Sequence, residues 1–163
     1  MAVLSRETIL EYWLERVLRS YPGQGAKFLA GERDPFRNPA GSTMRQALGV
    51  LLDELSAGMD RERAAEALDS IVQIRAVQGL EPSQALEFIF QLKEILRPQL
   101  DGPERELVEG RIDELALLAF DFYMKYRERT YQARTNEARR RIFVMERRQG
   151  AGGAQEWQER GGI

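Results

Sequence analysis

The chain has 163 residues, with 24 Lys or Arg against 26 Asp or Glu, and therefore a formal net charge of −2. It contains no Cys and no His, which excludes disulfides, thiolate catalysis and Cys-based metal sites, and removes the commonest general base and metal ligand. The length fits one domain, and Leu and Ala far outnumber Val, Ile and Thr, which favours helices. We therefore expect an all-α, non-enzymatic protein with no cofactor and no metal site.

The first predicted helix begins after an N-cap at Ser5 and ends near Ser20, because Pro22 cannot continue it. Apolar side chains cover most of its circumference, so it should be buried on a wide face. The stretch that follows, up to Gly41, is rich in Gly and Pro. Within it, residues 34–39 predict consecutive turns.

Three more helices are predicted from capping residues and apolar periodicity. Each has a residue suited to its start and a Gly or Pro at its end: Ser42 to Gly58, Asp60 to Gly79, and Pro82 to Pro98. The last of the three is apolar except for one narrow polar stripe. We therefore expect it to be the central helix of the protein.

No Pro interrupts the chain between Pro103 and Gly150, which predicts a long C-terminal helix. Its apolar line runs as far as Tyr126, and a second line starts five residues later, a turn of about 140° around a helix. One half can pack on its own domain, and the other half must face something else. The candidate dimer interface consists of Tyr126, Tyr131, Ile142 and Met145. A helical homodimer is therefore expected.

The ends of the chain give the domain limits. Residues 150–163 are rich in Gly and are expected to form a disordered tail after a single domain over residues 1–149. No apolar run is long enough to span a membrane, and the N-terminus lacks the pattern of a signal peptide. We expect a cytoplasmic protein without membrane insertion.

The C-terminal helix is basic, whereas the rest of the chain is acidic. Residues 121–150 carry nine Arg or Lys against four Asp or Glu. The arginines could neutralise nucleic-acid phosphates, or they could form a solvated helix face with partners four residues away. The acidic body and the lack of a recognisable reading motif make nucleic-acid binding the weaker of these two interpretations.

Arg75 and Gln78 stand out because their positions in the third predicted helix turn them toward its apolar side. Both side chains could serve the carbonyls at the end of that helix, or pair with a carboxylate of Asp34, Glu87 or Glu94. A third interpretation is a site for a ligand or partner. On that interpretation the candidate pocket consists of Arg75, Gln78, Phe36 and Asn38.

Three spaced groups of residues carry a resemblance to a known family. They are Ile9, Leu10, Trp13, Tyr21 and Pro22 with residues 34–41; residues 74–78, 82–85 and 88–93; and Asp121, Tyr123 and Met124 with residues 127–137. This set, which covers about residues 7–148, resembles the RsbRD N-terminal domain family. That family is named for an RsbT co-antagonist of bacterial stressosomes.

The resemblance implies an all-helical, globin-like sensory module without haem, usually dimeric through its terminal helices. Such modules commonly lead into a STAS domain that contacts a switch kinase, whereas this chain ends after the helix, which predicts a stand-alone form. We expect a regulatory interaction module that signals by helix repacking, with an unidentified protein partner or small ligand. The alternatives are an accessory scaffold for a redox or respiratory complex, as stand-alone relatives in sulfate-reducing bacteria suggest, and weak nucleic-acid binding.

Overall fold

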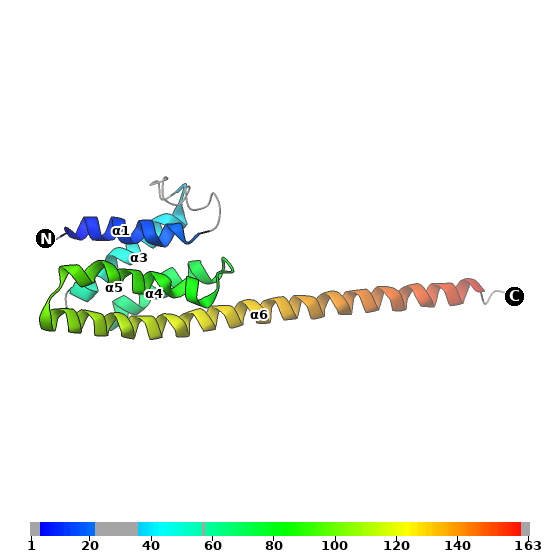
Figure 1. The fold of residues 1–163 in the computed structure, drawn as a ribbon. Helices are drawn as coiled ribbons and strands as arrows, with labels where there is room; N and C mark the ends of the chain where they lie inside the picture. The colour runs from blue at the N-terminus through cyan, green and yellow to red at the C-terminus, as the bar shows by residue number, and fades with distance from the viewer. Residues whose placement is uncertain (1–3, 22–35, 57, 161–163) are drawn as a thin grey trace. The chain divides into compact units, whose positions relative to one another are not determined.

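The computed structural model describes residues 4–21, 36–56 and 58–160, and the side chains among them up to residue 147. These residues form the helices shown in Figure 1: α1 (Arg6–Arg19), α3 (Pro39–Ser56), α4 (Arg61–Ala76), α5 (Pro82–Leu96), the 3₁₀ helix η1 (Arg97–Gln99) and α6 (Gly102–Arg160). The described segments contain no strand. The all-α prediction is confirmed, and the globin-like arrangement of the helices stays a prediction.

Local capping explains where most of the helices begin. Ser5 Oγ accepts a hydrogen bond from the Thr8 amide at 3.2 Å, and the Asp60 side chain caps α4 in the same way. Pro82 is the first residue of α5, where its fixed φ suits a helix and its missing N–H costs nothing. These three predicted starts are confirmed.

Helix α3 begins three residues earlier than the predicted cap at Ser42. Asn38 caps it instead, because its Oδ1 accepts from the Gly41 amide at 2.8 Å and its carbonyl accepts from the Ser42 amide at 3.0 Å. Pro39 then occupies the first helical position, which Pro favours. The side chain of Asn38 folds so closely over Gly41 that a Cβ there would lie 2.2 Å from Asn38 Nδ2.

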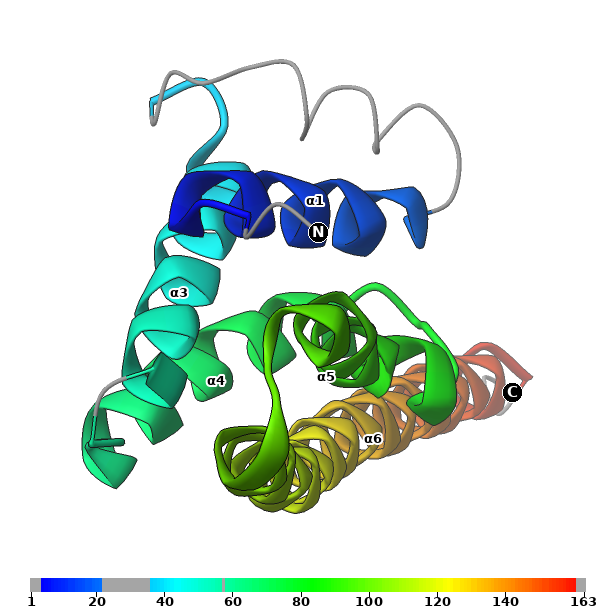
Figure 2. The same cartoon turned by 60° about the vertical axis from the view of Figure 1, so that its left-hand side comes forward.

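The helices of residues 4–126 share one apolar core. Helix α3 packs on α4, and α1 packs against both α3 and α5 (Figure 2). The side chains of Trp13, Leu48, Leu68 and Phe88 are fully or almost fully buried within this cluster. Trp13 Nε1 also donates to the Phe88 carbonyl at 2.7 Å, which ties α1 to α5. Helix α5 is thus largely buried, as its apolar circumference predicts.

The first half of α6 contributes its own apolar line to the same core. The buried side chains on this line are Val108, Ile112, Leu115, Ala119 and Tyr123. Ion pairs flank them on the surface, including Lys93 with Asp113 at 2.8 Å and Arg61 with Glu114 at 2.9 Å. Exposed pairs of this kind add little stability, so the apolar line is what holds this half of α6 in place.

The chain separates into two compact units, Met1–Tyr126 and Arg127–Ile163. Helix α6 belongs to both, and its bounds show one uninterrupted helix. None of the described helices combines the length and apolar character needed to cross a bilayer. The domain end at residue 149 and the disordered tail from residue 150 stay predictions.

Candidate functional site

Arg75 lies in the last turn of α4 and is only 1% exposed, so its predicted position on the apolar side is confirmed. Its Nε donates to the Ala85 carbonyl at 2.7 Å, and its Nη2 donates to the Gln84 carbonyl at 2.6 Å. The same Nη2 donates to Ser20 Oγ at 3.0 Å, while that hydroxyl donates to the Val17 carbonyl at 2.6 Å. One side chain therefore joins the end of α4 to the first turn of α5 and to the end of α1.

Two aromatic rings enclose the guanidinium. Arg75 Cζ lies 5.4 Å from the centre of the Tyr21 ring and 5.6 Å from the centre of the Phe88 ring. Phe88 in turn stacks on Trp13 with their ring centres 6.2 Å apart. These distances are typical of cation–π contacts, which stabilise a cation that has left water.

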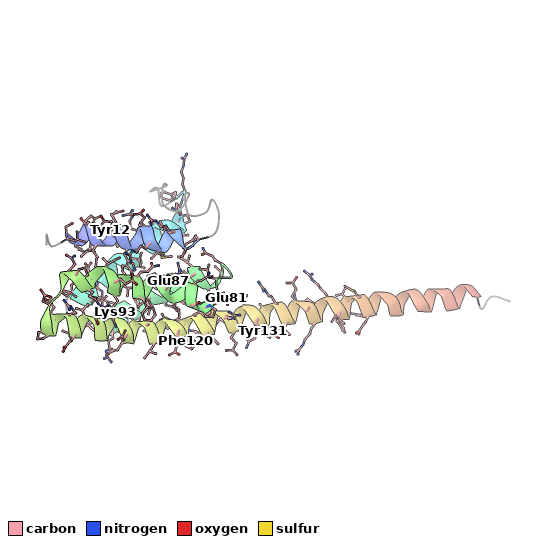
Figure 3. The ribbon with its side chains drawn as sticks, viewed as in Figure 1. Tyr12, Glu81, Glu87, Lys93, Phe120 and Tyr131 are labelled. Atoms are coloured by element: carbon pink, nitrogen blue, oxygen red, sulfur yellow. The ribbon has the colours of Figure 1, made fainter. Side chains whose placement is uncertain are left out.

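Two buried polar groups of this cluster have no hydrogen-bond partner among the described residues: Arg75 Nη1 and Tyr21 Oη. No carboxylate of the described residues forms an ion pair with Arg75 either; Glu94 pairs with Arg16 at 2.9 Å, and Glu87 is exposed on α5 (Figure 3). Burial lowers the pKa of Arg75, although Tyr21 and Glu87 oppose this effect. Burial raises the pKa of Tyr21, against the opposing effects of Arg75 and Gln78.

The four predicted pocket residues have different surroundings. Arg75 is buried and Phe36 is 96% exposed. Gln78 is exposed because α4 ends at Ala76, so its predicted position on the apolar side of that helix is wrong. Asn38 is buried and caps α3, which gives it a structural role. Asp34, one of the predicted carboxylate partners of Arg75, lies outside the described residues. A single pocket that combines all four residues stays a prediction.

Sequence analysis missed the groups that actually contact Arg75. The acceptors from α5 are main-chain carbonyls, which carry no residue-specific signal. Tyr21 follows the C-terminus of α1, so helical periodicity did not assign it to any face. The one available signal was that Tyr21 and Arg75 both belong to the motifs that resemble the family.

The second candidate site is the exposed side of residues 127–147. Tyr131, Ile142 and Met145 are 72%, 56% and 59% exposed, and Phe143 and Val144 are exposed beside them. Figure 3 labels Tyr131 on α6. The nearby arginines include Arg141, which pairs with Glu137, and Arg147, whose Cζ lies 5.7 Å from the Phe143 ring centre. Five large apolar side chains on one exposed segment are unusual for a surface that faces only water.

Tyr126, the fourth predicted interface residue, has a different environment. It is half-buried, and its Oη donates to both carboxylate oxygens of Asp69, at 2.8 and 2.9 Å. Tyr123, one helical turn earlier, is buried and donates to the Leu80 carbonyl at 2.8 Å. These two tyrosines join α6 to α4 and to the connection between α4 and α5. The dimer interface itself stays a prediction.

Comparison with known protein families shows the family to which the chain belongs. The model of the RsbT co-antagonist protein rsbRD N-terminal domain matches residues 7–138 of the chain. The chain belongs to this family. An RsbRD N-terminal domain is a regulatory signalling domain, which places the protein among stress-signalling modules.

One curated relative of this RsbRD N-terminal domain is an uncharacterized protein from Archaeoglobus fulgidus. It is 22% identical over 147 residues, which cover 87% of this chain and 90% of the relative. No solved structure matches the chain. Among the described residues, no group of three or more His, Cys, Asp or Glu is arranged to hold a metal ion.

Proposed function

We propose that the protein is a non-enzymatic sensory or regulatory interaction module that acts as a homodimer. The observation that carries this proposal is the exposed apolar surface of residues 131–145, on a chain that belongs to a regulatory family. The signal would be a change in helix packing that α6 transmits. The accessory scaffold and the weak nucleic-acid binder expected as alternatives have no observation of their own that favours them.

The spacing of the exposed residues suits a two-helix seam. Tyr131, Ala138 and Met145 recur every seven residues, and Ile142 lies four residues after Ala138 and three before Met145. Apolar residues with alternating steps of three and four are typical of a coiled coil. In a lone helix these side chains would stay in water, so a second copy of the same helix is the occupant we propose.

The charges beside this seam favour a parallel arrangement of the two copies. With Ile142 and Met145 at the seam, Arg141 and Glu146 take the flanking positions that meet across a parallel pair. An antiparallel pair would instead bring Arg134 and Arg141 of one copy toward the same arginines of the other, which is repulsive. Residues 127–147 carry seven Arg against three Glu, so two copies repel each other overall and we expect added salt to strengthen the dimer.

The contacts of α6 within residues 4–126 provide a route for the signal. The Tyr123 hydroxyl binds the Leu80 carbonyl, and Leu80 lies between Arg75 and the first turn of α5. A shift of the connection between α4 and α5 would therefore act directly on α6. Tyr126, bound to Asp69 of α4, adds a second point of attachment.

The test is a pair of matched substitutions on neighbouring residues. Ile142→Asp places a charge in the proposed seam, and Phe143→Asp places the same charge one residue away on an equally exposed side chain, at 57% against 56%. In sedimentation velocity, the wild-type protein and Phe143→Asp should sediment as dimers and Ile142→Asp as a monomer. Dimers in all three proteins would contradict the proposed seam, and a monomeric wild type would contradict the homodimer itself.

A further inference from the structure

We propose that Arg75 and Tyr21 form a binding site for a small, singly charged carboxylate. The site lies where the C-terminal ends of α1 and α4 meet the first turn of α5. It is separate from the seam on residues 127–147, so it does not depend on the dimer proposed above. Binding of a carboxylate at this site would be the signal to which the regulatory module responds.

The hydrogen bonds of Arg75 leave one nitrogen of the guanidinium, Nη1, buried without a partner among the described residues. A guanidinium has five N–H donors. The Nε donor binds Ala85, and Nη2 binds both Gln84 and Ser20. Nη1 is buried and binds nothing among the described residues, so neither of its two N–H donors has an acceptor there.

Tyr21 provides the second group. Its ring lies over the guanidinium, and its buried hydroxyl lies beside Arg75 and Gln78, close enough for both to act on its pKa, but it makes no hydrogen bond of ordinary geometry among the described residues. Burial raises the pKa of this phenol, which therefore stays protonated at neutral pH and can donate a hydrogen bond. The two groups together offer donors to an oxygen-bearing ligand and no charged acceptor.

The charge balance points to an anion in preference to a water molecule. A guanidinium keeps its proton in proteins, so Arg75 is a buried cation with no ion-pair partner among the described residues. A water molecule would fill the open hydrogen-bonding positions, but it would not neutralise the charge. An anion does both, and only one negative charge is needed to match one cation.

A carboxylate fits this donor set better than a spherical ion does. Carboxylate oxygens match the fork of N–H groups on a guanidinium, which is why Arg and carboxylates form directed pairs. The Tyr21 hydroxyl can donate to one of the same oxygens. Because both groups are buried among Phe88 and other core side chains, a ligand must displace some of these side chains to enter, so a small one is expected, with formate and acetate as the simplest examples.

The experiment measures the thermal unfolding midpoint of the full chain at increasing acetate or formate concentration. A bulky sulfonate buffer salt keeps the ionic strength constant, and chloride and sulfate series run in parallel. A ligand that binds only the folded protein stabilises it by RT ln(1 + [L]/Kd), so the midpoint keeps rising with the logarithm of the ligand concentration once that concentration exceeds Kd. The wild-type protein should therefore show this logarithmic rise with both carboxylates and a smaller response to chloride and sulfate.

Three variants identify the site. Arg75→Met should abolish the logarithmic rise with carboxylates, and Tyr21→Phe should move its onset to an about ten-fold higher concentration, because one hydrogen bond to a charged group is lost. Arg45→Met is the matched control, since Arg45 is paired with Glu11 on the other side of α1, and it should respond like the wild type. If Arg75→Met does not fold, the rise of the midpoint with carboxylate in Tyr21→Phe, compared with that of the wild type, tests the site.

The proposal is overturned if the midpoint of the wild-type protein does not rise with either carboxylate, or if chloride or sulfate raises the midpoint more than the carboxylates do. It is also overturned if Tyr21→Phe and a folded Arg75→Met respond as the wild type does. The monomeric Ile142→Asp protein should keep the wild-type response. Failure of the dimer and failure of the carboxylate site are therefore separate results.

Discussion

Arg75 is the residue whose burial most needs a physical explanation. A buried cation is costly unless partners compensate for the loss of water. Here two main-chain carbonyls, a serine hydroxyl and two aromatic rings supply part of that compensation. The carbonyls of Gln84 and Ala85 lie within α5, where they also accept the ordinary helical hydrogen bonds. They do not depend on Arg75 for a partner.

This leads to a prediction about stability in buffer without carboxylates. Arg75→Met keeps a long side chain, removes the buried charge and leaves no acceptor unpaired, so the free energy of unfolding should change by no more than about 1 kcal/mol. Urea denaturation, monitored by circular dichroism, measures this change in the free energy of unfolding. A loss of about 3 kcal/mol would mean that Arg75 pairs with a structural carboxylate, because removing one partner strands the other charge.

At the scale of the elements, the start of α3 shows how one side chain sets a helix boundary. Asn38 Oδ1 and the Gly41 amide form the first contact of the helix, and the close fit of the two residues explains why a Gly stands there.

Asn38→Ala should lower the free energy of unfolding by about 1 kcal/mol, because it removes this cap. Ser42→Ala is the matched control. Ser42 was the cap expected from sequence, but it lies inside the helix, so its substitution should lower the free energy of unfolding much less. Thermal or urea unfolding of the two variants gives the comparison. An equal loss in both, or a larger loss for Ser42→Ala, would contradict Asn38 as the cap.

The element boundaries also show which features are readable from sequence. Ser5, Asp60 and Pro82 each begin a helix by a short-range rule, so the sequence alone located them. Asn38 was read as a turn residue because Asn is equally common in turns and at caps, and only the observed hydrogen bond distinguishes the two. Short-range signals are ambiguous wherever one residue type serves two local structures.

The candidate site was less predictable than the helices. Helical phase correctly placed Arg75 on the buried side of α4, because that depends only on residues within one helix. Its contacts with Ser20, Gln84 and Tyr21 depend on how α1, α4 and α5 pack together, and periodicity carries no information on that. The family resemblance was a better guide here, since its motifs include both Tyr21 and Arg75.

At the scale of the whole molecule, the two halves of α6 have different environments. Its first half is a core helix, with Tyr123 and Ile112 buried and Tyr126 bound to Asp69. Its second half exposes Tyr131, Ile142 and Met145. The change of apolar phase after Tyr126 separates these two roles in the sequence, and it coincides with the boundary between the two compact units. A regulatory family member with such a helix is well suited to couple a folded domain to a partner.

The most direct test of this account is the molecular mass of the protein with and without residues 130–163, measured by sedimentation equilibrium. Residues 1–129 retain the whole buried core, so the truncated protein should remain soluble and folded. The full chain should have the mass of a dimer and the truncated chain that of a monomer. A truncated protein that still has the mass of a dimer, or a full chain with the mass of a monomer, would contradict a dimer held by the second half of α6.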